Sequence, residues 1–166
     1  MIRELRADLI GSLGVRVRIL PPMPVPEGCY ESGRGQFIST KVLREMMREV
    51  PEDTGKMLGL IDRDLCIPIL TFVFGEAQLG GTASIVSLAR LRQEFHGLPP
   101  DREILYERLF KECLHEVGHT YGLVHCPDRR CTMYLSNTVT DVDRKGAAYC
   151  ASCAAMIRGA TEPREE

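Results

Sequence analysis

The chain has 166 residues, of which 44% are hydrophobic and 27% are charged, and its formal net charge is −2. This composition is typical of one globular domain, and we expect residues 1–166 to form a single unit. The small net charge and the lack of a long basic block argue against a nucleic-acid-binding protein. The longest apolar run, Cys66 to Phe74, is too short to cross a bilayer, and the N-terminus does not look like a signal peptide. We therefore predict a cytoplasmic protein with no membrane partner.

Periodicity predicts the elements of the first third of the chain. Apolar and charged residues alternate through VRVRIL (15–20), which is the pattern of a strand. Residues 21–35 contain four prolines and three glycines and are expected to form a loop. Residues 39–50 carry an apolar stripe at helical spacing, and Ser39 or Thr40 could cap this helix. The stripe consists of Val42, Leu43, Met46, Met47 and Val50.

Three short apolar segments follow and are predicted to be strands. Residues 57–61 and 67–74 are too short for helices, and Phe72, Val73 and Phe74 in the second segment favour extended chain. Residues 80–91 begin with two glycines and interleave small or polar residues with apolar ones, which suits either an edge strand or an inner strand. The order strand, helix, strand favours a mostly parallel sheet.

The clearest helix covers residues 101–121. Asp101 is placed to cap its start, Glu103 lies in its first turn, and Gly122 follows its last residue. The tail from residue 159 to residue 166 is polar at its end and is expected to be disordered.

Two histidines near the end of this helix form a metal-binding pair. His115 and His119 are four residues apart and therefore share one helical face, so both imidazoles can reach one ion. Glu116 is turned about 100° from His115, which places its carboxylate beside the ion without making it a ligand. That is the position of a general base for a metal-bound water.

A third histidine completes the set of ligands. Gly122 can adopt a positive φ and end the helix, after which the chain can turn back and bring His125 to the same ion. Three protein ligands leave one position for water, as in catalytic zinc sites. Zinc lowers the pKa of such water to about 7, so Glu116 would accept its proton while the ion polarises the carbonyl under attack.

Four of the seven cysteines form two closely spaced pairs. The pair Cys126 and Cys131 is followed by the pair Cys150 and Cys153, a spacing that indicates a four-cysteine structural zinc site. Two disulfides or a redox pair are the alternatives, and a reducing compartment disfavours both. The other cysteines are expected to be buried thiols, namely Cys29, Cys66 and Cys113.

His125 and Cys126 would then bind different ions from consecutive positions. The chain after Gly122 has little core of its own, whereas a structural zinc contributes ~10–16 kcal/mol to folding. We therefore predict that the cysteine site fixes the direction in which His125 points. Basic residues near the cysteines could offset the negative charge of a zinc tetrathiolate, namely Arg129, Arg130, Arg144 and Lys145.

Together these motifs resemble those of the metzincins, and specifically those of the archaemetzincins. The metzincin motif HExxHxxGxxH is matched by His115, Glu116, His119, Gly122 and His125, and Met133 matches the methionine of the family's later turn. Archaemetzincins add one cysteine after the third histidine and three further downstream. Cys126, Cys131, Cys150 and Cys153 match those positions. The motif resemblance covers residues 115–153.

The resemblance implies an α/β (α+β) fold of the metzincin type. In this fold a twisted mixed sheet carries a backing helix and an active-site helix, and a second zinc holds a small C-terminal part. The single domain would divide into an upper part, residues 1–122, and a lower part, residues 123–158. A peptide would lie antiparallel to an edge strand expected within residues 82–88. Met133 would pack below the zinc ligands, and Tyr134 could stabilise an oxyanion or line the cleft.

The leading functional prediction is a zinc-dependent peptidase that acts on peptides or unfolded segments and uses one catalytic and one structural zinc ion. The alternative is a zinc-stabilised module that binds peptides or proteins with little turnover. Glu116 separates the two readings, because a module that only binds has no use for a carboxylate placed to transfer protons. The substrate and the oligomeric state are not specified by these patterns.

Overall fold

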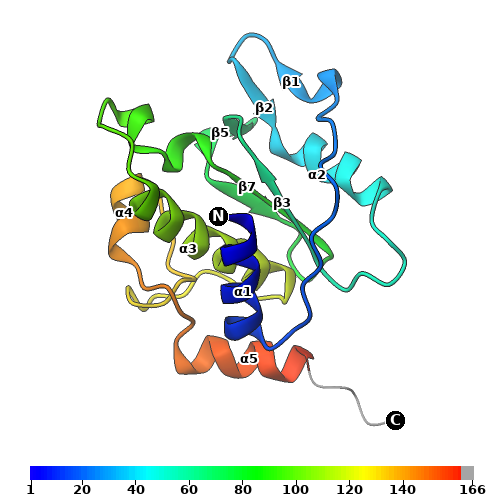
Figure 1. Ribbon diagram of the computed structural model, residues 1–166, viewed down its shortest axis with the longest axis vertical. Coiled ribbons are helices and arrows are strands. Elements are labelled where there is room, and N and C mark those ends of the chain that lie inside the picture. Colours follow the sequence, from blue (N-terminus) through cyan, green and yellow to red (C-terminus); the bar gives the residue numbers. More distant parts are fainter. Residues whose placement is uncertain (162–166) are drawn as a thin grey trace.

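The computed structural model describes residues 1–161 (Figure 1). Its α-helices are α1 (Ile2–Leu13), α2 (Ser39–Arg48), α3 (Arg102–Thr120), α4 (Val139–Arg144) and α5 (Ala151–Thr161). Its strands are β1 (Tyr30–Glu31), β2 (Gln36–Ile38), β3 (Met57–Ile61), β4 (Leu65–Ile67), β5 (Leu70–Val73), β6 (Gly75–Ala77) and β7 (Ala83–Ser87). No helix within this part of the chain combines the length and the apolar character needed to cross a membrane.

The strands form two mixed sheets. One has the order β1-β2-β4-β5 and the other has the order β3-β7-β6. The pairs β2–β4 and β3–β7 are parallel, whereas β1–β2, β4–β5 and β6–β7 are antiparallel. The expectation of a mixed sheet is confirmed. The expectation of a mostly parallel sheet is wrong, because short hairpins supply the extra strands and hairpins pair antiparallel.

Helices cover both faces of the sheet β3-β7-β6 (Figure 1). On one face α2 packs its apolar stripe against Ile85 of β7 and residues of β3 and β4. On the other face α1 and α3 pack together against Val86 of β7. Ile85 and Val86 point to opposite faces because side chains alternate along a strand. The sheet therefore holds α3, which carries the metal-binding motif, in a fixed position.

A separate apolar cluster lies after α3. It is formed by Leu123, Cys131, Met133, Cys153 and Ile157. This cluster brings α5 against the turns that follow α3, at the end of the molecule away from the β1–β2 hairpin (Figure 1). Cysteine side chains make up part of it, so this part of the chain has only a small hydrocarbon core.

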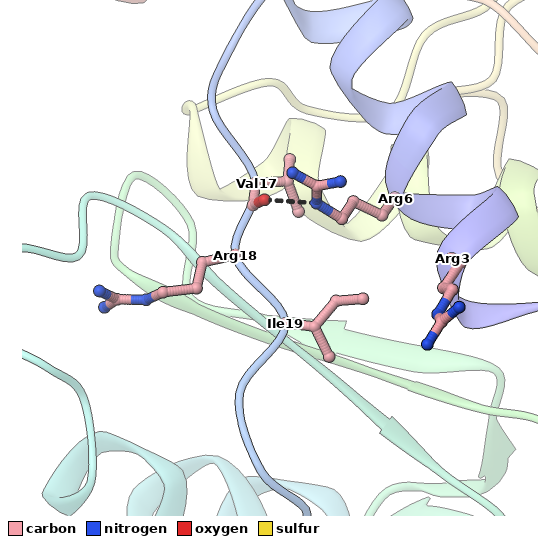
Figure 2. A pocket seen from close by; sticks show the side chains of 5 residues that line it. All are labelled: Arg3, Arg6, Val17, Arg18 and Ile19. Atoms are coloured by element: carbon pink, nitrogen blue, oxygen red, sulfur yellow. Dashed lines mark hydrogen bonds between the residues drawn. The ribbon is translucent and has the colours of Figure 1, made fainter.

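The first predicted strand is absent. Residues 15–20 run as extended chain without a strand partner, after a helix, α1, that periodicity did not predict. The backbone oxygen of Val17 accepts a hydrogen bond from Arg6 Nε on α1, 2.8 Å away. Figure 2 shows this contact between α1 and the extended chain, with the Arg18 side chain pointing away from α1. Arg18 forms an ion pair with Asp53. Alternation reports on which sides the residues face and does not guarantee a neighbouring strand.

Two other predicted strands differ in extent and place. Residues 67–74 form the end of β4, a tight turn and β5, because Ile67 pairs with Leu70 across the turn that contains Pro68. Residues 80–91 contain β7, which lies between β3 and β6, so it is an inner strand. Small residues such as Ala83 and Ser84 are fully buried there, because helices cover both faces of the strand.

Helix starts and ends also show where local signals succeed. Asp101 caps α3 as predicted, since its Oδ1 accepts from the backbone N–H groups of Glu103 and Ile104, each 2.9 Å away. Ser39 does not cap α2, because its buried hydroxyl contacts Glu76 and the Cys66 carbonyl. Helix α5 continues to Thr161, so the prediction of a disordered tail is wrong for residues 159–161. Residues 162–166 of the predicted tail lie outside the described part of the chain.

Candidate metal centre and cleft

The last two turns of α3 present one polar face. Glu112, His115, Glu116 and His119 recur at intervals of three and four residues, so their side chains lie on the same side of the helix. His115 and Glu116 are each only 5% exposed. All four line a cleft whose opposite wall is residues 70–77, which include β5 and β6. The helix thus carries its chemistry to the inner surface of a cleft.

Backbone carbonyls fix the two helix histidines. His115 Nδ1 lies 2.9 Å from the oxygen of Thr132, and His119 Nδ1 lies 2.7 Å from the oxygen of Leu123. A carbonyl only accepts, so each Nδ1 must carry the proton and donate. The Nε2 atoms are then free of protons and point at each other across 3.1 Å. Metal-binding histidines are typically oriented in this way by a hydrogen bond from their other ring nitrogen.

Gly122 brings the third histidine back to the helix. It has a φ of 89°, and its backbone N–H donates to the oxygen of His119, 2.9 Å away, so the chain reverses directly after α3. The His125 ring consequently lies 5.3 Å from that of His115 and 5.1 Å from that of His119, measured between centroids. One nitrogen from each of the three rings lies within 4.8 Å of the others. Tetrahedral zinc spaces its nitrogen ligands by ~3.3 Å, so this set fits such an ion.

The surroundings keep the imidazoles neutral. Burial lowers the pKa of His115 well below its usual value, and the ammonium of Lys145 lowers it further. Burial also lowers the pKa values of His119 and His125. Neutral imidazole is the form that donates its lone pair to a metal, so these three side chains are held in the state that metal binding requires.

Glu116 lies in a space left by a glycine. A β-carbon at Gly75 of β6 would come within 2.6 Å of Glu116 Cγ and 2.7 Å of its Oε1. Burial raises the pKa of Glu116 well above its usual value, and the neighbouring carboxylate of Glu112 adds to this. A carboxylate with a raised pKa is a better proton acceptor at neutral pH than an exposed one.

The strand that faces α3 across the cleft is β6. It lies at the edge of its sheet, in the order β3-β7-β6. The prediction of an edge strand within residues 82–88 is therefore wrong, since β7 occupies that range and is paired on both sides. Small and polar residues in a strand are also typical of an edge strand, which led to this prediction. In β7 the residues are small because α2 and α3 pack closely on them.

The four predicted cysteines gather into a second cluster. Their sulfur atoms lie within 4.8 Å of one another, and the Sγ atoms of Cys126 and Cys150 are 3.9 Å apart. Tetrahedral zinc spaces its sulfur ligands by ~3.8 Å, so these side chains fit a zinc ion as well. The backbone N–H of Cys153, at the start of α5, lowers the pKa of the Cys150 thiol to about 7. All seven cysteines are free thiols, and Cys29, Cys66 and Cys113 are buried as predicted.

Met133 packs against α3 next to Gly118, and the position of Tyr134 gives little support to a role in the cleft. Met133 is fully buried, and its sulfur is so close to the helix that a β-carbon at Gly118 would come within 2.5 Å of it. Tyr134 is half-buried. Among the described residues, the cleft lining includes Leu135 but not Tyr134.

Comparisons with known proteins identify the family. The model of Peptidase family M54 matches residues 13–159. The chain belongs to peptidase family M54. It is 45% identical to the archaemetzincin of Methanocaldococcus jannaschii over 135 residues, which is 81% of this chain and 73% of that protein. The predicted archaemetzincin resemblance and the class of zinc metalloprotease are thereby confirmed.

Solved structures confirm the fold. The archaemetzincin of Methanopyrus kandleri is 35% identical, with a TM-score of 0.80 over 96% of this chain and 84% of that one. The archaemetzincin of Archaeoglobus fulgidus, solved with malonate, is 37% identical, with a TM-score of 0.79 over 93% of this chain and 90% of that one. A zinc-dependent peptidase from Methanocorpusculum labreanum is 30% identical, with a TM-score of 0.84 over 93% of this chain and 92% of that one.

The sequence patterns of this M54 peptidase did not single out Glu112, and they assigned Lys145 to the wrong cluster. Glu112 lines the cleft and pairs with Lys145, whose ammonium lies 2.7 Å from Glu112 Oε1. Lys145 was expected to offset the charge of the cysteine cluster, but its side chain points to α3 and not to the sulfur atoms. Helical spacing could have revealed Glu112, which precedes Glu116 by four residues. Nothing in the sequence pairs position 112 with position 145, because the contact depends on how α4 packs.

Proposed function

We propose that this M54 peptidase hydrolyses peptide bonds in extended segments bound along β6, with Glu116 as the group that moves the proton. One observation carries the proposal: the buried carboxylate of Glu116 lies beside three converging imidazoles in a cleft whose other wall is an open strand edge. The donor set, the proton acceptor and a place for extended chain are thus found together.

The three histidines would hold one zinc ion. When bound, zinc would supply Lewis acidity toward the peptide carbonyl and toward water. The protein's contribution is rigidity, because the Nδ1 contacts of His115 and His119 hold both rings before any ion arrives. The two imidazole rings then need little further ordering when an ion and a substrate bind.

Glu116 would accept a proton from the attacking water and deliver it to the leaving amine. Its raised pKa favours the first step at neutral pH, and the protonated acid is a suitable donor in the second. Because Gly75 has no side chain, the carboxylate can lie directly against β6, where the scissile bond would pass. The position of Glu116 and its raised pKa therefore both favour proton transfer by this side chain.

Substrate would add to the sheet next to β6. This strand pairs with β7 on one side only, so its other edge can pair with extended peptide main chain. The side chain of Glu76 in β6 is held by the hydroxyls of Ser39 and Thr40 at the start of α2, which anchors the strand. Main-chain pairing selects for unfolded or extended segments, so folded domains would be poor substrates and nucleic acids are not expected to bind.

The cysteine cluster would hold a second, structural zinc ion. Cys126 follows His125 directly, and its backbone N–H donates to the Met133 carbonyl, 2.9 Å away. Four thiolates would leave no open position on the ion, so its role is to hold the lower part, residues 123–158, together. The seven free thiols fit a reducing compartment, and we place the enzyme in the cytoplasm.

The decisive experiment compares the wild type with Glu116→Gln and Glu116→Ala on a mixed library of unstructured peptides. Bound zinc is measured for each protein, so that loss of the ion is separated from loss of the proton acceptor. We expect cleavage by the wild type and at least ~10²-fold slower cleavage by both variants at unchanged zinc content. Cleavage that survives both substitutions would remove Glu116 from the mechanism. If neither the wild type nor the variants cleave, while the peptides still bind, the protein is a binding module.

A further inference from the structure

We propose that Lys145 is a positioning residue of the histidine site, and that its task is to neutralise Glu112 and keep that carboxylate from joining the metal ligands. This inference rests on the proposed function, because it concerns the same cleft. It assigns a purpose to a buried ion pair that the hydrolytic steps themselves do not use.

Glu112 is an unusual neighbour for a three-histidine site. It lies on the same face of α3 as His115 and Glu116, lines the same cleft, and is only 2% exposed. Its Oε1 atom is buried and has no hydrogen-bond partner among the described residues, since the contact with Lys145 falls outside hydrogen-bond geometry. A buried carboxylate without a counter-charge is costly and seeks the nearest cation. An ion at the histidines would be a cation in the same cleft.

Lys145 supplies the counter-charge. Its Nζ lies 2.7 Å from Glu112 Oε1, and its side chain is completely buried. The same Nζ lies 3.4 Å from Nδ1 of His115. Nδ1 donates to the Thr132 oxygen, so the ammonium and the ring meet as two donors and not as a hydrogen-bonded pair. Lys145 therefore stands between Glu112 and His115 without competing for the carbonyl that orients the ring.

Contacts between α3 and the end of α4 hold Lys145 in place. Lys111 of α3 donates to the oxygens of Val142 and Asp143, 3.2 Å and 3.0 Å away, near the end of α4. Arg108 of α3 donates from Nε and a second nitrogen to both carboxylate oxygens of Asp143, at 2.6 Å and 2.8 Å. The end of α4 is thus fastened to the middle of α3, and the next residue along the chain after α4 is Lys145. These contacts explain how an ammonium can be delivered to a fully buried position.

The arrangement keeps the number of protein ligands at three. A fourth ligand from Glu112 would take up the position that a peptidase leaves open for water and substrate. With Lys145 in place, the carboxylate has a partner of opposite charge and no reason to move. The pair Glu112–Lys145 is accordingly neutral as a unit, and removing both charges together should be tolerated far better than removing one.

The experiment measures the cobalt-substituted protein, because the visible spectrum of cobalt reports the number of ligands independently of catalysis. Lys145→Met, Glu112→Gln and the double variant are compared with the wild type, and Lys145→Arg serves as the charge-conserving control. We expect Lys145→Met alone to shift the spectrum toward a higher coordination number and to lower kcat at least ~10-fold. The double variant and Lys145→Arg should return the spectrum to that of the wild type.

The outcomes separate this role from simple packing and from failure of the proposed function. Lys145→Met with an unchanged cobalt spectrum would overturn the proposal, because a residue that only fills space affects stability and not coordination. If Lys145→Met does not fold, Lys145→Gln takes its place: a spectrum shifted toward a higher coordination number supports the proposal, and a wild-type spectrum overturns it. Glu116→Gln is the matched control, since it should abolish cleavage while leaving the spectrum tetrahedral. If Glu116→Gln cleaves peptides as fast as the wild type, the proposed hydrolytic role of Glu116 fails, but the cobalt spectra of the Lys145 variants still test the present proposal.

Discussion

Gly75 of β6 lies directly against Glu116 of α3, and a β-carbon at position 75 would come within 2.6 Å of the Glu116 Cγ atom. The same β-carbon would lie 2.6 Å from the backbone oxygen of Ile85 in β7. Real β-carbons essentially never approach so closely, so any side chain at position 75 must displace the carboxylate, the strand, or both. Glu116, the residue proposed to move the proton, is therefore positioned by a residue without a side chain.

Gly75→Ala is expected to lower kcat/KM by ~10²-fold, because a displacement of about 1 Å at a reacting group costs that much. Zinc content should stay at the wild-type value, since the three atoms nearest to a β-carbon at position 75 belong to Glu116 and Ile85 and not to the histidines. Gly55→Ala is the matched control, because a β-carbon there would meet nothing within 4 Å. Steady-state kinetics with metal analysis checks both variants. Wild-type kinetics for Gly75→Ala would show that Glu116 needs no such space.

Gly118→Ala should destabilise the protein although alanine favours helices. A β-carbon at Gly118 would lie 2.5 Å from the Met133 sulfur and 3.1 Å from Tyr149 Cε1. Overpacking of this kind costs ~1–3 kcal/mol. Combining the substitution with Met133→Ala makes room, so the loss in the double variant should be smaller than the sum of the two single losses. Denaturant unfolding of the metal-loaded proteins measures this coupling, and strictly additive losses would contradict the contact.

Changing Cys150 and Cys153 together to serine should weaken zinc binding at the histidines, although neither cysteine touches them. The wild type is expected to hold two zinc ions per chain, and the variant one at most. Because Cys126 would lose its partners in the tetrathiolate, the adjoining His125 would no longer be held toward His115 and His119. Zinc competition with a chelator measures the remaining site, where we expect at least ~10-fold weaker affinity. Unchanged zinc affinity at the histidines would show that the cysteine cluster does not support the histidine site.

Asp141 gives the stability a defined pH dependence. Its Oδ2 accepts hydrogen bonds from the Thr138 hydroxyl and from the backbone N–H groups of Thr138 and Asn137 at the start of α4. The bond from the Thr138 side chain is the largest cause of its lowered pKa. The folded state therefore prefers the ionised form, so the stabilisation is present above the ordinary pKa of 3.8 and is lost as the pH falls through the lowered value.

Asp141→Asn removes this dependence. The difference in unfolding free energy between the wild type and the variant should shrink as the pH falls from about 5 to about 2. Taking the difference cancels the acid-induced loss of metal, which both proteins share. Chemical unfolding at a series of pH values measures it. A difference that stays constant with pH would show that the ionised carboxylate makes no such contribution.

Local signals were reliable where one short segment contains all the partners. Asp101 caps α3 within its own first turn, and Gly122 turns the chain by its own positive φ. His115 and His119 converge because the helix spaces them. Such features depend on contacts between residues a few positions apart, which a sequence displays directly.

Signals failed where the partner is distant along the chain. VRVRIL has the alternation of a strand but lacks a neighbouring strand, and β7 has small residues because helices cover both of its faces. Ser39 has the side chain of a helix cap but is drawn to Glu76, which lies 37 positions away. In each case packing or pairing with a remote element outweighed the local preference.

Sequence spacing predicted the candidate metal ligands of this M54 peptidase, because a helix of known pitch and a glycine turn bring three histidines together, and two cysteine pairs indicate a second cluster. The packing of the elements was needed to show which strand forms the wall of the cleft, that Gly75 makes room for Glu116, and that Lys145 faces Glu112. The difference follows from the range over which each kind of contact acts. Helical spacing acts over a few residues, whereas strand order and the burial of a charge pair depend on how whole elements pack against one another.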